Sequence, residues 1–70
     1  MPEYRYMRFD GFVYRQLTQE DARETNVPEV WRSDARRWEA PSIASIGLEA
    51  LWYGMPLTEE QVRAMDPDAA

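Results

Sequence analysis

Aromatic and long side chains form two runs on either side of Asp10–Gly11, within the stretch Tyr4–Leu17. An Asp-Gly pair between such runs is typical of a β-hairpin, because both central residues of a type I′ turn need a positive φ. The pattern predicts a two-residue turn, and this turn fixes the register of the two strands. The expected pairs are Phe9 with Phe12, Arg8 with Val13, Met7 with Tyr14, Tyr6 with Arg15, Arg5 with Gln16 and Tyr4 with Leu17.

A three-residue loop over residues 9–11 is the competing arrangement. It sets Arg5 opposite Arg15, and like charges directly opposite each other are unfavourable. With the two-residue turn, the face expected in the core carries Met7, Phe9, Phe12 and Tyr14. The other face carries Tyr6 and Arg15, and we expect it to be half-exposed, with a cation–π contact worth about 0.5–1 kcal/mol.

The segment Pro28–Ala40 fits two interpretations, and both place Trp31 and Trp38 on one face. As a helix it has proline at its first position and an apolar stripe with helical spacing. As a second hairpin it turns at residues 34–35, without glycine and with two arginines opposed. We favour β pairing, because one isolated hairpin is only marginally stable without further strands.

Residues 41–54 predict a helix that is apolar over most of its circumference, as in a buried helix. Pro41–Ser42 supplies a stop and a cap, and Gly54 suits the left-handed residue at the end. Gly47 inside the helix indicates close approach of the hairpin backbone. The apolar stretch 43–57 is too short to span a bilayer and is interrupted by polar residues and proline.

A second, shorter helix is predicted for Leu57–Met65. Thr58 and Gln61 form a T-x-x-Q capping box, and the leucine can pack against Val62. The last residues, 66–70, are expected to fray. The whole chain therefore predicts one small α+β domain: residues 3–40 are mainly β, with a sheet of three or four strands, and residues 42–65 form two helices. The acidic connector at 18–27 is either a short helical turn capped by Thr18 or a surface loop.

Composition excludes several kinds of chemistry. The chain has 70 residues, no cysteine and no histidine, and all of its positive charge is arginine. Nucleophile–histidine pairs and zinc sites built on these ligands are thereby excluded. Glu59 and Glu60 are adjacent in sequence and do not face each other on a helix, so we interpret them as solvated acidic residues at a helix start. We expect no enzyme, no metal and no cofactor.

The net charge of −5 argues against general binding to nucleic acid or to anionic membranes. The N-terminal residues lack the apolar region of a signal peptide, so we expect a soluble, cytoplasmic protein. The expected partner is another protein, either a different chain or a second copy.

Three hypotheses for function follow. The first is a non-enzymatic protein–protein interaction module, a small accessory or adaptor subunit, because the helix at 43–53 is apolar almost all round and tryptophan is abundant. The second is an acidic inhibitor, such as an antitoxin or a phage-type anti-defence protein, that occludes a basic nucleic-acid-binding surface. Its acidic residues would be Glu59, Glu60, Asp66 and Asp68.

The third hypothesis is single-stranded nucleic-acid binding, with bases stacked on an aromatic sheet and arginines at the phosphates. The competing interpretation, which we favour, is that the aromatic side chains form the core and arginine stems cover them. Interface hot spots are enriched in Tyr, Trp and Arg, so protein binding ranks above nucleic-acid binding. The candidate partner-binding residues are Tyr4, Tyr6, Arg8, Arg15, Trp31, Trp38, Trp52, Glu59 and Glu60.

Overall fold

The computed structural model describes residues 3–18 and 27–70, which form an antiparallel sheet and two helices. The strands are β1 (Tyr4–Phe9), β2 (Phe12–Leu17), β3 (Glu29–Arg32), β4 (Arg37–Glu39) and β5 (Met55–Leu57). The helices are α1 (Ala44–Tyr53) and α2 (Glu59–Met65). The strand order is β4-β3-β2-β1-β5. The α+β class is confirmed, and the sheet has five strands instead of three or four. The expected connector lies almost entirely outside the described residues.

The β1–β2 hairpin has the predicted two-residue turn. Asp10 and Gly11 have φ values of 52° and 81°, as both central residues of a type I′ turn require. The strands pair from Phe9 opposite Phe12 to Tyr4 opposite Leu17, which confirms the whole predicted register.

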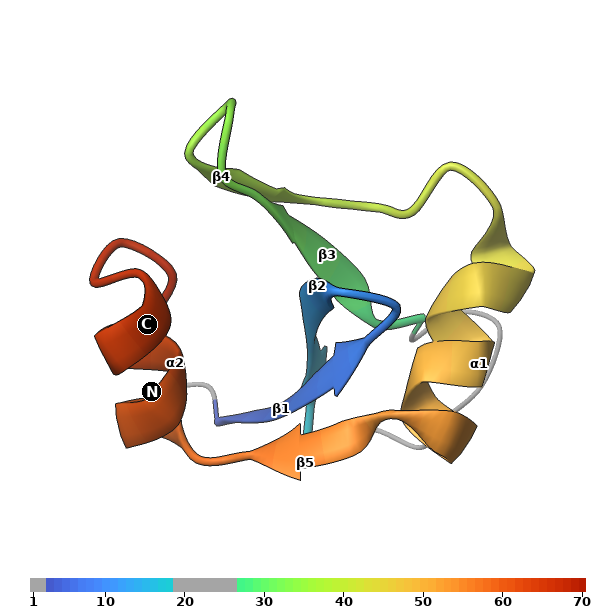
Figure 1. Ribbon diagram of the computed structural model, residues 1–70. Helices are drawn as coiled ribbons and strands as arrows, with labels where there is room; N and C mark the ends of the chain where they lie inside the picture. Colours follow the sequence, from blue (N-terminus) through green and yellow to red (C-terminus); the bar gives the residue numbers. More distant parts are fainter. Residues whose placement is uncertain (1–2, 19–26) are drawn as a thin grey trace.

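The sheet lies between the two helices, with α1 on one face and α2 on the other (Figure 1). Consecutive residues of the central strands point to opposite faces, so each strand supplies two core clusters. The cluster on the α2 face consists of Tyr6, Val13, Trp31, Val62 and Ala69. The cluster on the α1 face consists of Met7, Tyr14, Val30 and Ala50.

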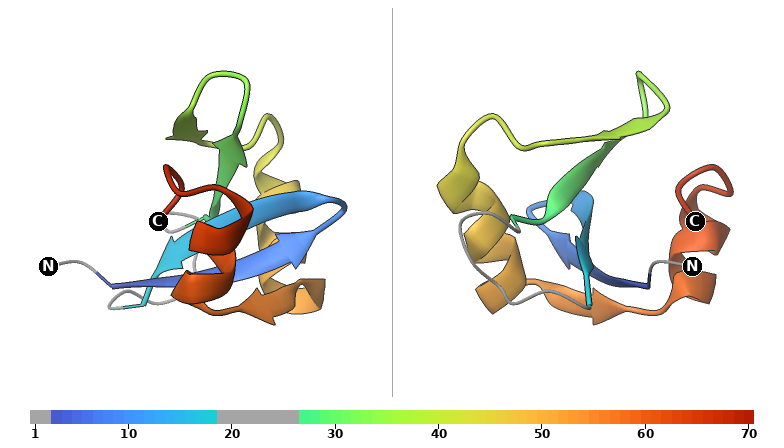
Figure 2. Two further views of the ribbon diagram at one scale, coloured as in Figure 1. Left: turned by 60° about the vertical axis from the view of Figure 1, so that its left-hand side comes forward. Right: turned by 180° about the vertical axis from the view of Figure 1, so that it is seen from behind.

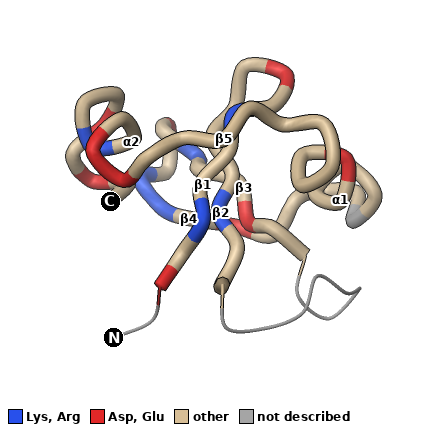
Figure 3. Tube along the Cα trace, turned by 90° about the horizontal axis from the view of Figure 1, so that it is seen from below, with Lys and Arg blue, Asp and Glu red and all other residues tan. Residues whose placement is uncertain are grey.

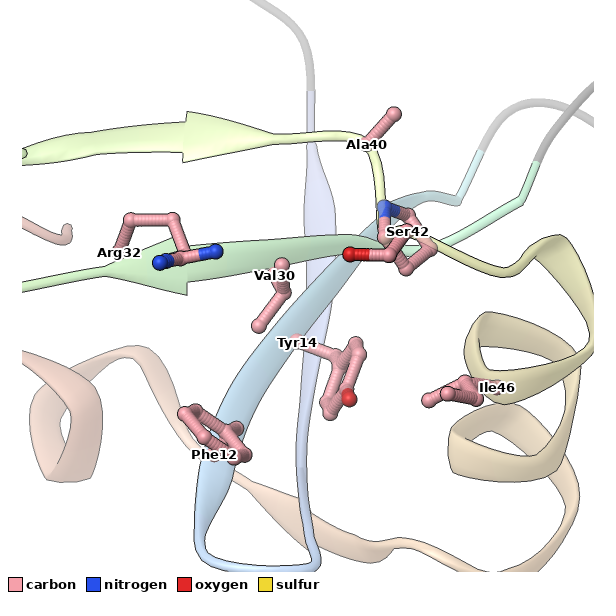
Figure 4. A pocket seen from close by; sticks show the side chains of 8 residues that line it. Phe12, Tyr14, Val30, Arg32, Ala40, Ser42 and Ile46 are labelled. Atoms are coloured by element: carbon pink, nitrogen blue, oxygen red, sulfur yellow. The ribbon is translucent and has the colours of Figure 1, made fainter.

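Both faces of the hairpin therefore contribute to the core. The prediction that the second face is half-exposed is wrong for Tyr6, which is 9% exposed and lies under α2. The expected core face is only partly right. Met7 and Tyr14 are buried, but Phe12 is 51% exposed. It directly follows the turn, at the end of the hairpin, where α1 does not cover the sheet (Figure 4).

The segment Pro28–Ala40 forms the second hairpin, so the β interpretation is correct. Trp31 lies opposite Trp38, and Arg32 lies opposite Arg37. The like-charge pair that argued against this hairpin is offset by two carboxylates. Arg32 Nε lies 3.5 Å from Asp34 Oδ1, and Arg37 Nε lies 2.6 Å from Glu39 Oε2. The glycine-free loop places Arg36 in the left-handed region, with φ of 56°.

Helix α1 begins later and ends differently from the prediction. Its N-cap is Ile43, which forms no side-chain cap hydrogen bond, and not Ser42. Gly54 has φ of −69° and ψ of 154°, an extended and not a left-handed conformation. The chain therefore runs from α1 directly into β5, where Pro56 lies opposite Met7 of β1.

Gly47 makes a close approach, but to a different segment from the one predicted. A Cβ atom at this position would lie 2.5 Å from Val27 Cγ1 and 3.1 Å from the carbonyl oxygen of Pro28. The neighbour is thus the segment that enters β3, and not the β1–β2 hairpin.

Helix α2 begins with a capping box. Thr58 accepts a hydrogen bond from the Gln61 backbone N–H at 3.1 Å, and the Gln61 side chain accepts one from the Thr58 N–H at 2.8 Å. Val62 is fully buried. Residues 66–70, which the sequence predicts to fray, lie against the sheet: Ala69 is 4% exposed and its carbonyl oxygen accepts a hydrogen bond from Trp38 Nε1 at 3.2 Å.

Candidate functional site

Four aromatic side chains gather on the α2 face of the sheet. They are Tyr4 and Tyr6 of β1, Trp31 of β3 and Trp38 of β4. Ring centroids lie 6.4 Å apart for Tyr4–Tyr6, 6.2 Å for Tyr6–Trp38 and 5.3 Å for Trp31–Trp38. The rings are tilted against each other by 41°, 42° and 57°, so none stacks face to face. We call this set the aromatic face.

Arg15 of β2 lies between two rings of the aromatic face. Its guanidinium carbon is 4.2 Å from the Tyr4 ring centroid and 4.5 Å from that of Trp38. The cation–π contact expected with Tyr6 is thus made with these two rings. Arg15 Nε also donates a hydrogen bond to Glu29 Oε1 at 3.0 Å, so its charge is already paired.

The C-terminal segment, residues 66–70, binds the edge of the aromatic face through Asp66. Arg36 donates to both carboxylate oxygens of Asp66, from Nη1 and Nη2, each at 3.0 Å. Trp31 Nε1 donates to Asp66 Oδ2 at 2.9 Å, and Arg36 also pairs with Asp68. Burial acts to raise the pKa of Asp66, but these donors, the Asp68 backbone N–H and the Arg36 charge together lower it below its usual value.

The aromatic face is therefore covered. Trp31 is 8% exposed, and burial together with the nearby negative charge of Glu59 raises the pKa of Tyr6. This arrangement matches the interpretation in which aromatic side chains form the core. Stacking of bases on these rings would first require α2 and the C-terminal segment to move.

The acidic residues proposed for an inhibitor do not form one free surface. Asp66 and Asp68 are paired with Arg36. Glu59 lies 3.4 Å from Arg63 on the same helix, and Glu60 is exposed. Figure 3 shows acidic positions on both helices, the C-terminal segment, the turns and the sheet, and most arginines along the strands.

The most exposed large apolar side chains occur where α1 ends and β5 begins. Trp52 is 67% exposed, Tyr53 is 75% exposed and Met55 is 68% exposed. These three residues lie within four consecutive positions of the chain, and we call them the Trp52 patch. Arg8 is exposed and lies opposite Met55 in the register of β1 and β5. Alternation along the strands places both side chains on the α2 face of the sheet, the face of Tyr6 and Leu57.

A shallow pocket of about 220 Å³ opens on the α1 face. In Figure 4, Tyr14 and Val30 line it from the sheet and Ile46 lines it from α1. The volume is below the range of about 300–1,000 Å³ that is usual for small-molecule and cofactor sites. It is enough for one apolar side chain or ring, since an engineered cavity of about 150 Å³ holds benzene. The remaining lining residues are Phe12, Arg32, Ala40, Pro41 and Ser42.

The sequence identified Trp31, Trp38 and Arg15 as candidate partner-binding residues, and the structure places them together. Sequence reasoning missed the contact between Arg36 and Asp66, which are 30 residues apart. The only signal was the opposite charge of an arginine-rich turn and an acidic C-terminus, and that signal does not specify a pair.

Within residues 3–18 and 27–70, no three Asp or Glu side chains are grouped so that they could hold a metal ion. None of the helices in the described part of the chain is long and apolar enough to cross a membrane. No protein-family model matches the chain, and neither do curated proteins or solved structures.

Proposed function

We propose that this chain is a non-enzymatic protein–protein interaction module, a small cytoplasmic accessory subunit that docks through the Trp52 patch. The observation that supports this most strongly is the exposure of Trp52, Tyr53 and Met55, between 67% and 75%. Tryptophan and tyrosine are residue types enriched in interface hot spots, and methionine is also enriched in interfaces.

The area of the patch suits the centre of an interface. An aromatic side chain buries about 150–250 Å², so the two rings and the methionine together offer roughly 400 Å². One partner in a standard interface contributes about 800 Å². The patch would then be the buried centre, and polar residues around it would form the rim.

The surroundings of the patch favour docking through side chains. Strand β5 is at the edge of the sheet, but it has three residues and a central proline without an N–H group, and such an edge is a poor template for another strand. Among the described residues, no carboxylate forms an ion pair with Arg8. The partner that fits is apolar at its centre and carries a carboxylate near Arg8.

The test is a quantitative pull-down from the cytosolic fraction of the native host. Wild type is compared with Trp52→Gln/Tyr53→Gln and with a control, Ile43→Gln/Met65→Gln, which changes two apolar residues that are 57% and 50% exposed elsewhere. Thermal unfolding checks that all three proteins fold. We expect a stoichiometric protein partner with wild type and control, and at least a tenfold loss with the patch variant, because truncated hot spots cost about 2 kcal/mol or more. Equal recovery with the patch variant would refute the proposal.

A further inference from the structure

We propose that Arg36, Trp31 and Trp38 form a recognition site for an acidic peptide of a partner protein, and that the chain's own C-terminal segment occupies this site as a built-in competitor. We call these three residues the Arg36 site. It lies away from the Trp52 patch, so this inference does not rest on the proposed function.

The geometry of the Arg36 site is that of carboxylate recognition. The Arg36 guanidinium donates to both oxygens of Asp66, each at 3.0 Å, and such bidentate pairs are the strong and directional ones. The indole N–H of Trp31 donates to the same carboxylate at 2.9 Å. Three donors from one hairpin therefore converge on a side chain from the far end of the sequence, which is only 15% exposed.

The site also forms a hydrogen bond with a peptide backbone. Trp38 Nε1 donates to the carbonyl oxygen of Ala69 at 3.2 Å, three residues after the bound aspartate. The acceptor in the structure is itself a peptide carbonyl oxygen, and this observation favours a peptide over nucleic acid. The matching ligand is a segment with Asp-x-Asp followed by a small residue, in a turn like that of residues 66–69, where the Ala69 N–H donates to the Asp66 carbonyl oxygen at 3.0 Å.

The internal occupant is attached by the buried side chains of Val62 and Ala69 and by the hydrogen bonds of Asp66 and Ala69. Helix α2 has seven residues, and Val62 is the buried one. A single residue, Thr58, joins the helix to β5. Figure 2 shows α2 and the C-terminal segment on the face of the sheet opposite α1, where no other described element covers them. An element that contributes two buried side chains opens at a lower free energy than the central strands of the sheet.

Competition by the internal segment predicts how binding responds to mutation. A ligand that binds only the open form has an apparent dissociation constant equal to its intrinsic value divided by the open fraction. Asp66→Asn/Asp68→Asn removes both charges of the internal occupant and leaves the Arg36 site intact. We expect α2 amide exchange to accelerate by about tenfold or more, because a hydrogen bond to a charged group contributes about that factor.

The experiment uses the 70-residue chain and an acetylated synthetic peptide of residues 64–70. The peptide is titrated into wild type, Asp66→Asn/Asp68→Asn and the triple variant that adds Arg36→Gln, and the indole N–H signals are followed by NMR. We expect the double variant to bind about tenfold more tightly than wild type, and the triple variant to lose this gain. Glu49→Gln/Glu60→Gln is the control with the same charge change, and it should behave as wild type. If the double variant does not fold, Asp68→Asn alone replaces it.

Two further ligands distinguish recognition of an acidic peptide from binding of nucleic acid. A peptide with both aspartates replaced by asparagine should not bind, and neither should an octathymidylate. Binding of the octathymidylate in place of the peptide would overturn the inference in favour of nucleic acid. It would be overturned equally if α2 exchange stayed slow in the double variant, or if exchange became fast and the peptide still caused no shift.

Discussion

Gly54 sets the junction between α1 and β5, and its replacement by alanine gives a sharp test of the structure. The φ of −69° and ψ of 154° suit any residue, so alanine introduces no backbone strain. The effect comes from contact alone. An added Cβ would lie closer than 3.0 Å to the carbonyl oxygen of Ala50 and 3.2 Å from Cβ and Cγ of Met7.

The residues that the added Cβ would contact are buried and cannot easily move aside. Ala50 is 0% exposed and Met7 is 4% exposed, and the Ala50 carbonyl accepts the Gly54 N–H at 2.9 Å. Moving the chain away must lengthen that hydrogen bond. Overpacking costs about 1–3 kcal/mol and a lost hydrogen bond about 0.5–1.5 kcal/mol, so Gly54→Ala should lower the free energy of unfolding by about 2–4 kcal/mol. A core in a chain of this size supplies about 3–5 kcal/mol, so the variant should be close to unfolded.

Urea denaturation followed by far-ultraviolet circular dichroism measures the change, with an osmolyte added if the variant is partly unfolded in buffer. Ser45→Ala is the control, since Ser45 is exposed on α1 and alanine has the higher helix propensity. The control should stay within about 1 kcal/mol of wild type. A Gly54→Ala cost no larger than that of Ser45→Ala would refute the described junction.

Two further predictions concern the α2 face. Val62→Ala should lower the free energy of unfolding by about 1.5–3 kcal/mol, because apolar burial is lost and a cavity is left. Amide hydrogen exchange should accelerate in α2 before it accelerates in β1 and β2. Uniform acceleration over all of these elements would contradict local opening of α2. The pKa of Asp66 is lowered from 3.8 by its donors. The stability that Asp66 contributes is therefore complete above about pH 4 and is lost as the pH falls through the lower folded-state pKa. Amide exchange in α2, corrected for intrinsic rates, should then be constant from pH 5 to 8 and should accelerate at lower pH. Asp66→Asn should abolish this acceleration at low pH.

Local signals account for the parts of the fold that the sequence predicts correctly. The Asp10–Gly11 turn fixes the β1–β2 register because its chemistry lies within two residues. The second hairpin could be expected although its arginines oppose each other, because one isolated hairpin is only marginally stable without further strands. In the structure Asp34 and Glu39 offset the two arginines. Strand β5 could not be recognised, since three residues around Pro56 have no alternation and acquire their structure only by lying next to β1.

Non-local contacts account for what sequence reasoning missed. The docking of residues 66–70 depends on the contact of Asp66 with Arg36 and Trp31 from another element, and no pattern within the segment reveals it. The same holds for the candidate site. Tyr6 could be named as an aromatic candidate, but its burial depends on α2, which approaches from the far end of the chain.

The use of aromatic residues differs between the sheet and α1, and this difference supports the proposed docking surface. Tyr6 and Trp31 are buried by α2, as expected for a small chain that needs every large side chain in its core. Trp52 and Tyr53 remain 67% and 75% exposed, although full burial of a large apolar side chain stabilises a fold by about 1.5–3 kcal/mol. For a domain whose core supplies only about 3–5 kcal/mol, leaving both rings in water is a conflict between composition and stability. Such conflicts are expected at functional sites, and a partner that covers both rings would resolve this one.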